Sequence, residues 1–150
     1  MKIVMKSMAL LSLILSSHAA VAACSVDVEV GDALTFSATQ MTVKKSCGDV
    51  TINLVHTGKL AASVMGHNWV LTNETDANDV AAKGLAAGLA NNYVPSGDAR
   101  VLASTKIIGG GESTSISFST DALTPGGKYI YVCTFPGHSF VMRGTLIVGA

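Results

Sequence analysis

Charged side chains are scarce in this 150-residue sequence. They make up 13% of it, and ten basic residues balance ten acidic ones. No stretch gathers lysine or arginine, so we expect no nucleic-acid partner, because nucleic-acid binding needs a clustered basic face. With so little charge, the surface should carry neutral patches and exert little long-range attraction on partners.

The sequence also lacks an apolar run long enough to cross a bilayer, which takes about 20 residues. Its most apolar run, MALLSLIL, follows Lys2 and Lys6 and precedes the small residues SSHAAVAA. A basic start, a short apolar middle and a small-residue end are typical of a secretory signal peptide. We therefore expect residues 1–23 to be a signal peptide, cleaved after Ala22 or Ala23.

Cys24 offers a second interpretation of the same end of the chain. The sequence VAAC, which ends at Cys24, also resembles a bacterial lipoprotein cleavage box, in which the cysteine receives a lipid. A lipid and a disulfide at Cys24 exclude each other. Plain secretion is the preferred interpretation, since firm anchoring usually takes a second membrane signal and no basic patch accompanies Cys24.

Internal repeats and low-complexity linkers are absent, so residues 24–150 should form one domain. Short runs with period-two alternation predict strands, and turns such as GGG at 109–111 and TPGG at 124–127 separate them. Seven or eight strands of this kind predict an all-β fold, a Greek-key β-sandwich or closed barrel. The runs are SVDVEV, ALTFSATQMTV, DVTINLVHTG, GHNWVLTN, VLASTKII, STSISFST, KYIYVCTF and RGTLIVG. Trp69 should face the core.

One segment differs from the rest in composition. Residues 75–93 are rich in alanine, and Thr75 or Asp76 could cap a helix there. Gly84 and Gly88 each cost such a helix about 1 kcal/mol, so a broken helix is expected. The fold should therefore carry one helical insertion.

The sequence contains only three cysteines, an odd number. If Cys24 and Cys47 pair, Cys133 remains free, and an odd cysteine in an exported protein is often kept for chemistry. The stretch CTFPGHSFVM places His138 and Met142 close behind Cys133, around a Pro-Gly bend. Thiolate, thioether and imidazole together favour copper over magnesium, calcium or manganese, while zinc seldom takes methionine as its fourth ligand.

A blue-copper arrangement needs two histidines, one cysteine and a distant methionine. Beyond the predicted signal peptide, which contains His18, the second histidine must be His56 or His67. His67, in the predicted strand GHNWVLTN, is the preferred candidate. Because only His56 would then remain, a copper enzyme with a second, histidine-bound copper is not expected.

The sequence resembles the azurins, the small blue-copper proteins of the cupredoxin family, from Cys24 to Ala150. The stretches CSVDVEVGDALTF, VMGHNWVLT, NNYVPSGDARVLASTKIIGGGES and YVCTFPGHSFVMRGTL carry the resemblance. It implies a cupredoxin domain over residues 24–150, with helix 76–90 as a flap outside the barrel. It also implies one copper ion and a disulfide between Cys24 and Cys47. The implied ligands are His67, Cys133 and His138, with Met142 and the Gly66 carbonyl as weak axial contacts.

The resemblance further implies how the surroundings of the site would act. Asn68 would tie the ligand loops together, and backbone N–H groups near Asn68 and Phe135 would donate to the Cys133 sulfur. His56 matches a histidine that titrates near the site, although a buried histidine satisfied by the backbone explains it equally well. The implied partner patch consists of Leu34, Leu60, Val64, Met65, Leu85, Pro136 and Phe140. The bulk of Phe140 departs from the small residue common there.

The expected function is a periplasmic electron carrier, not an enzyme, that cycles one copper between Cu(I) and Cu(II). Its partners would be redox proteins such as c-type cytochromes, nitrite reductase or periplasmic dehydrogenases, bound transiently by a monomer. The alternative is a periplasmic copper-binding protein or chaperone without an electron-carrier role. An open, exchangeable Cu(I) site would favour that alternative.

Overall fold

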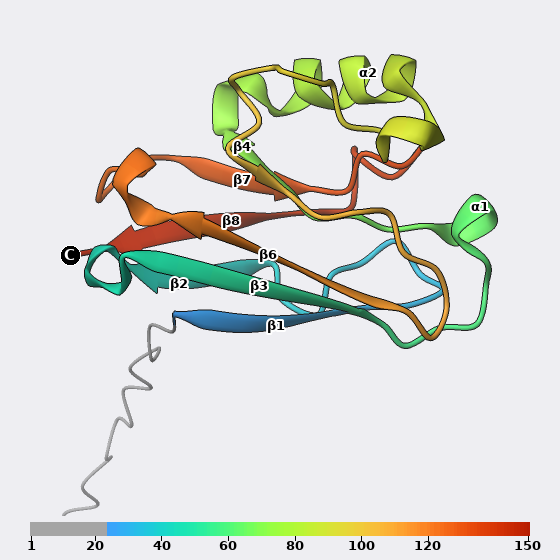
Figure 1. Cartoon of the computed structure of the whole chain (residues 1–150), viewed down its shortest axis with the longest axis horizontal. Coiled ribbons are helices and arrows are strands. Elements are labelled where there is room, and N and C mark those ends of the chain that lie inside the picture. The colour runs from blue at the N-terminus through green and yellow to red at the C-terminus, as the bar shows by residue number, and fades with distance from the viewer. Residues whose placement is uncertain (1–23) are drawn as a thin grey trace, which may run out of the picture.

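The computed structural model describes residues 24–150, so the predicted signal peptide lies outside the described residues. In the described part, eight strands form two sheets packed face to face (Figure 1). One sheet has the order β1-β3-β6 and the other β2-β8-β7-β4-β5. The strands are β1 Ser25–Val30, β2 Gln40–Lys44, β3 Asp49–His56, β4 Val70–Asn73, β5 Ala103–Ser104, β6 Ser113–Ser119, β7 Tyr129–Val132 and β8 Arg143–Gly149. The predicted Greek-key β-sandwich is confirmed.

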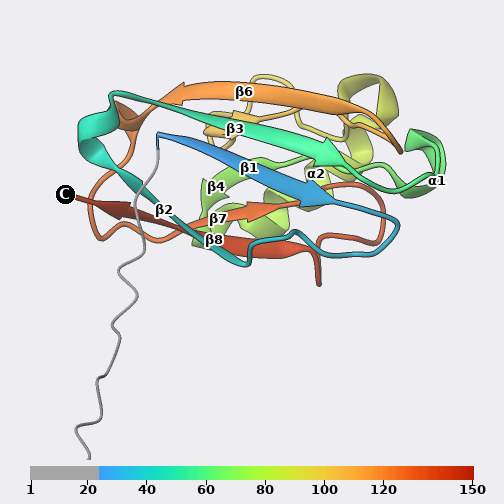
Figure 2. The ribbon, with the colours of Figure 1, turned by 90° about the horizontal axis from the view of Figure 1, so that it is seen from below.

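The pairing of the strands reflects a chain that moves repeatedly between the sheets (Figure 2). β1 runs parallel to β3 and β2 parallel to β8, whereas β3–β6, β4–β5, β4–β7 and β7–β8 are antiparallel. Period-two alternation places Val50, Ile52 and Leu54 inward, and all three are completely buried. Trp69 is also completely buried, stacked between Phe118 and Tyr131 with ring centroids 6.0 and 5.5 Å away.

Several predicted strands are shorter in the structure, and VLASTKII is a strand only over β5. The run ALTFSATQMTV is a strand only over β2, because residues 31–39 form a connection that carries Phe36 into the core edge-on to Tyr131. In β4, both faces of the strand are buried. Val70 faces away from Trp69 but packs with Val80 and Val132 beneath the helical insertion. A strand covered on both sides loses the polar alternation that a half-exposed strand shows.

The helical insertion is α2, Ala77–Ala87, which lies outside the five-stranded sheet (Figure 1). The prediction of a broken helix is confirmed, although α2 is shorter than residues 75–93. It ends at Gly88, whose φ of 74° is a conformation that favours glycine. Gly84 lies inside the helix, where a larger residue would clash. A Cβ at this position would come within 2.1 Å of the Tyr93 carbonyl oxygen. Short helical segments complete the chain: α1 Ala62–Met65, η1 Lys45–Cys47, η2 Glu74–Asp76, η3 Leu89–Asn91 and η4 Thr120–Ala122.

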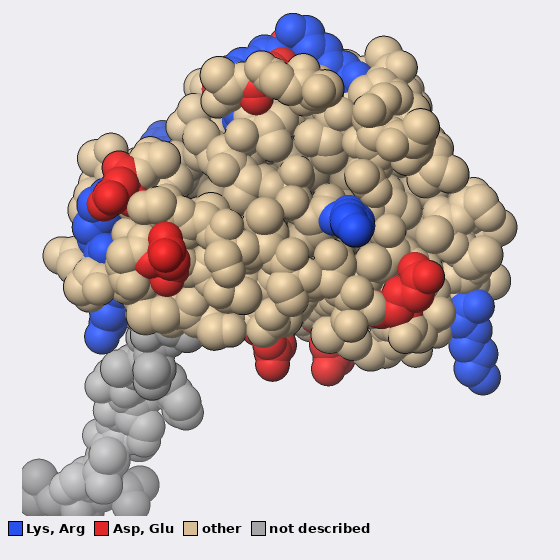
Figure 3. All heavy atoms as spheres, in the orientation of Figure 1, with Lys and Arg blue, Asp and Glu red and all other residues tan. Residues whose placement is uncertain are grey.

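A disulfide joins Cys24 to Cys47, as predicted. It occupies the sulfur that a lipid at Cys24 would need, which disfavours the lipoprotein interpretation. Within residues 24–150, no helix is both long and apolar enough to span a membrane. Charged side chains are scattered over the face seen in Figure 3. Lys83 and Arg100 form ion pairs with Asp79 and Asp98.

Candidate metal centre

The ligand loop, residues 133–142, connects β7 to β8. The ladder between these strands continues one step beyond them, because the Cys133 N–H donates to the Met142 carbonyl at 3.0 Å. Between these residues the chain turns tightly: the His138 N–H donates to the Phe135 carbonyl at 3.0 Å, and the Met142 N–H to the His138 carbonyl at 2.8 Å. Gly137, with φ of 82°, permits the turn. One loop therefore holds Cys133, His138 and Met142 in fixed relation.

His67 joins this loop from a distant part of the sequence. Its backbone forms a bridge with Ile108 just before β4, with its N–H donating to the Ile108 carbonyl at 3.0 Å. Its Nδ1 lies 3.8 Å from the Cys133 Sγ, and the His138 Nδ1 lies 3.5 Å from the same sulfur. The donor atoms of His67, Cys133 and His138 all lie within 4.8 Å of one another, and all three side chains are buried. The predicted triad is brought together.

Both imidazoles are suited to donate an electron pair. The His67 Nε2 lies 2.8 Å from the Gly31 carbonyl, so Nε2 carries the proton and Nδ1 presents its lone pair towards Cys133. Burial lowers the pKa of His67, with a smaller contribution in the same direction from His56. Burial, followed by the neighbouring His67, lowers the pKa of His138 to about 4. At neutral pH, both rings are therefore uncharged.

The third donor is a thiol in an apolar surrounding. Burial raises the pKa of Cys133 to about 11, and backbone N–H groups of Asn68 and Phe135 oppose this rise. Without a cation the thiol keeps its proton at neutral pH, whereas a bound metal cation would displace it. Two neutral imidazoles and one displaceable thiol proton make a site for a soft or borderline metal ion.

Asn68 links the segments that carry the triad. Its Oδ1 accepts from the Thr134 N–H at 2.8 Å, and its Nδ2 donates at 2.8 Å to the Thr134 hydroxyl and to the Asn92 carbonyl. Asn68 follows His67 and Thr134 follows Cys133, so one amide fixes the two segments together. No pattern in the sequence indicates Thr134 or Asn92, because their roles depend on a contact between distant segments.

The two predicted weak axial ligands, Met142 and Gly66, are close in sequence to residues of the triad. Met142 is completely buried at the end of the ligand loop. Gly66 is buried directly before His67, and a Cβ there would lie 2.2 Å from the Ala62 carbonyl oxygen and 2.7 Å from the Ile107 side chain. Glycine therefore allows the backbone to pass close to α1 immediately before His67.

His56 is buried and stands outside the triad. Its Nδ1 accepts from the Gly58 N–H at 3.1 Å, and its Nε2 lies 3.0 Å from the Met65 carbonyl. Its ring centroid is 5.1 Å from that of His67. Both nitrogens are thus satisfied by the backbone, which fits a structural role in the loop before His67.

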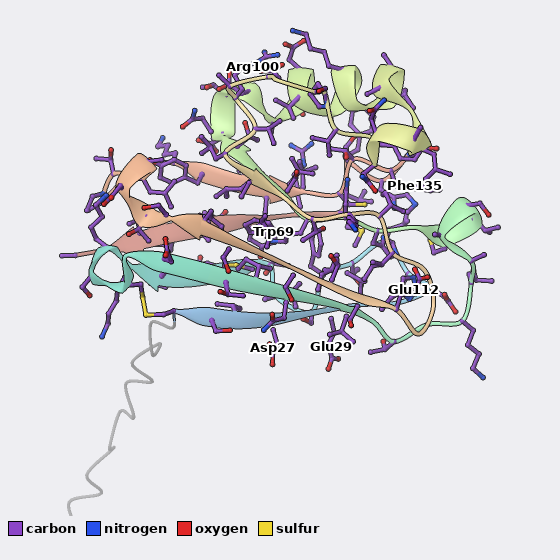
Figure 4. All side chains as sticks on the ribbon, viewed as in Figure 1. Asp27, Glu29, Trp69, Arg100, Glu112 and Phe135 are labelled. Carbon is purple, nitrogen blue, oxygen red and sulfur yellow. A yellow bond between two sulfur atoms is a disulfide. The ribbon has the colours of Figure 1, made fainter. Side chains whose placement is uncertain are left out.

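Several residues of the ligand loop and of the predicted patch are exposed and apolar. Phe140 is the most exposed of them, at 83%, and Val141, which the sequence analysis missed, is exposed at 61%. The other predicted patch residues are exposed or half-buried: Leu34, Leu60, Val64, Met65, Leu85 and Pro136. A groove of about 180 Å³ separates α2 from the loop, lined by Leu85, Phe135, Pro136 and Phe140 among others. Phe135 packs on His138, with ring centroids 4.6 Å apart (Figure 4).

Comparisons with known proteins agree with this geometry. A family model described as copper binding proteins of the plastocyanin/azurin family matches residues 22–149. The azurin of Achromobacter denitrificans is 52% identical over 125 residues, which cover 83% of this chain and 84% of that protein. The azurin of Pseudomonas aeruginosa strain PAO1 is 46% identical over 140 residues, which cover 93% of this chain and 94% of that protein. Among solved structures, the azurin Az-iso2 of the obligate methylotroph Methylomonas sp. strain J matches with a TM-score of 0.83 at 46% identity, covering 86% of this chain and 100% of that one.

Proposed function

The chain belongs to the plastocyanin/azurin family of copper-binding proteins, and from this premise we propose that it is a periplasmic electron carrier. One copper ion, bound by His67, Cys133 and His138, would cycle between Cu(I) and Cu(II). Met142 and the Gly66 carbonyl would be weak axial ligands. The observation that carries the proposal is the buried convergence of two imidazole Nδ1 atoms on one thiol.

The donor set fits copper by its chemistry. Thiolate and thioether are soft ligands and imidazole is intermediate, and the triad contains no carboxylate. Copper, when bound, supplies a single-electron couple. The residues supply what that couple needs: burial excludes water, and the Asn68 and Phe135 N–H groups lower the pKa of the sulfur.

Fast electron exchange needs ligands that hardly move when the charge of the ion changes. The backbone bonds of the ligand loop and the three hydrogen bonds of Asn68 hold the donors through contacts within the protein. This preorganisation supports an electron carrier over a copper chaperone, which releases its cargo and needs ligands that open.

We propose that electrons leave and enter at the edge of His138. Its side chain is 5% exposed and lies among the exposed apolar residues of the ligand loop. Exposed apolar patches commonly mark partner sites. Redox partners such as c-type cytochromes, nitrite reductase or periplasmic dehydrogenases would bind there briefly, through a small interface that allows rapid release.

The experiment adds Cu(II) to the purified, metal-free protein. The proposal predicts one tightly held copper per chain, an intense blue absorption and reversible bleaching by a mild reductant. Copper that stays colourless and is readily removed by a chelator would instead indicate a copper chaperone or store. Mass spectrometry of the periplasmic protein tests export, with a mature chain expected to begin at Ala23 or Cys24.

Replacement of Leu85 by glutamate tests the partner patch. Leu85 is 55% exposed, and all residues of the predicted patch are apolar. The variant should keep its colour and lose about tenfold in the rate of electron exchange with a c-type cytochrome, because a buried charge at an apolar interface is costly. Stopped-flow kinetics measures the rate. A matched exposed position far from the loop is Ile147, and Ile147→Glu should leave the rate unchanged.

A further inference from the structure

Arg143 reaches from the start of β8 back over the ligand loop. Its Nε donates to the Ser139 carbonyl at 2.8 Å. Its Nη2 donates to the same carbonyl and, at 3.0 Å, to the Oδ1 of Asn78. Asn78 belongs to the first turn of α2. One half-buried guanidinium therefore joins the middle of the ligand loop to the helix outside the sheet.

The contact falls at an otherwise weakly held point of the loop. Ser139 lies between His138 and Met142, and within residues 24–150 its carbonyl accepts hydrogen bonds from Arg143 alone. The neighbouring His138 carbonyl, by contrast, accepts from the N–H groups of Val141 and Met142 at 3.1 and 2.8 Å. Without Arg143, the turn from His138 to Met142 would keep its internal bonds but lose its attachment to α2.

A guanidinium suits this task better than another side chain would. It is planar, always charged and presents its donors in a fixed fork, so it can hold two acceptors in one geometry. Among the described residues, Arg143 forms no salt bridge, in contrast to Arg100, which pairs with Asp79 and Asp98. Its donors are therefore directed to the loop and to Asn78 rather than to a carboxylate.

We propose that Arg143 is a positioning residue of the metal centre. It fixes the turn from His138 to Met142 against α2, so that two prospective ligands keep their places when the ion changes charge. Contacts that orient ligands from outside the coordination shell commonly change metal affinity by 10- to 100-fold when they are removed. The effect of Arg143 on copper binding rests on the proposed function. The anchoring of the turn does not, because it concerns the metal-free chain as well.

The test compares Arg143→Met with Arg100→Met. Arg100 also anchors α2, through its ion pairs with Asp79 and Asp98, but it has no hydrogen bond to the ligand loop. In the metal-free protein, Arg143→Met should speed hydrogen exchange at the Val141 and Met142 amides about tenfold, whereas Arg100→Met should not. Asn78→Ala should shift the same amides in the same direction by less.

The metal-loaded proteins supply the second readout. Arg143→Met should weaken copper binding about tenfold and change the relative intensity of the two sulfur-to-copper absorption bands, while Arg100→Met leaves both as in the wild type. Arg143→Lys restores the charge without the fork, so its band intensities should stay altered. The inference would be overturned if Arg143→Met kept wild-type amide exchange and wild-type spectra, or if Arg100→Met changed them equally. It would also be overturned if Arg143→Lys fully recovered the wild-type spectrum. If the wild type forms no blue centre, the proposed function fails, while amide exchange still decides the role of Arg143.

Discussion

The two ends of the sandwich are closed by different means. At the end where β1 begins, the disulfide between Cys24 and Cys47 closes the chain covalently (Figure 4). The Thr120 hydroxyl adds hydrogen bonds to the Lys45 carbonyl at 2.9 Å and the Gly48 carbonyl at 3.0 Å. At the opposite end, where the ligand loop carries Phe135, the segments meet through non-covalent contacts, which are hydrogen bonds and side-chain packing. One end of the sandwich is therefore closed by a covalent bond, whereas the other is closed by non-covalent contacts.

The second end also brings three donor atoms together. The Cys133 sulfur and the two Nδ1 atoms face one another at 3.5 and 3.8 Å, distances at which sulfur forms at most a weak hydrogen bond. All three groups are buried, so none of them gains full hydration instead. The disulfide end therefore provides stability, while the ligand end keeps its donors available for an ion.

The largest effect should follow removal of the thiol. Cys133→Ser should abolish the blue absorption of the copper-loaded protein altogether, because the colour of such centres comes from charge transfer between thiolate sulfur and copper. Visible absorption and electron paramagnetic resonance spectra measure the loss. Replacing the other two cysteines, Cys24 and Cys47, by serine is the control and should leave the spectrum intact. A blue Cys133→Ser protein would remove the distinction between the two ends.

The next effect concerns what holds the ligand end before a metal binds. Asn68→Ala should lower the free energy of unfolding of the metal-free protein by about 4 kcal/mol, since it deletes three hydrogen bonds and orphans the buried Thr134 N–H. Denaturant titration measures this loss. Asn53 is the matched control, because it bonds Asp27 and Ser115 on the exposed face of the sheet. Asn53→Ala should cost at most about 1 kcal/mol, and equal losses would contradict the special role of Asn68.

The disulfide end should respond in stability alone. Replacing Cys24 and Cys47 together by serine opens a closure over 23 residues and should lower the free energy of unfolding by about 3 kcal/mol. The copper affinity and the spectrum should not change, because no hydrogen bond of this end reaches the ligand loop. Denaturation and copper titration of one preparation measure both quantities. A shifted spectrum would show that the ends are coupled.

The sequence predicted the parts of the molecule that depend on local pattern. Alternating residues revealed β1 and β3, and the ten residues from Cys133 revealed three donors on one loop. The need for a second histidine and the resemblance to the azurins favour His67 over His56, and the geometry agrees. The roles of Thr134 and Arg143 could not be foreseen, because they arise where segments distant in the sequence meet. The burial of both faces of β4 also depends on a distant segment, since nothing local predicted that α2 would cover it.

The smallest expected effect, the pH dependence of the metal-free protein, also sets the two ends apart. Burial lowers the pKa of His138 to about 4 and also lowers that of His67, whereas both cysteines at the other end are locked in a disulfide. Between about pH 6.5 and pH 4, the unfolded chain binds protons at these histidines that the folded chain does not. Stability should therefore be unaffected above this window and fall as the pH drops through it.

For His138 alone, this fall should amount to about 2 kcal/mol, because the partly accessible edge of the ring moderates the full effect of the shift. Denaturant titrations of the metal-free protein at pH 7 and pH 4.5 measure it, and His138→Gln should flatten the dependence without touching the disulfide end. The copper-loaded protein should show a shallower fall at first, since a metal-bound Nδ1 cannot accept a proton until the ion leaves. A metal-free protein that is equally stable at both pH values would mean that the imidazoles of the ligand end are hydrated. The two ends would then not differ in the burial of titratable donors.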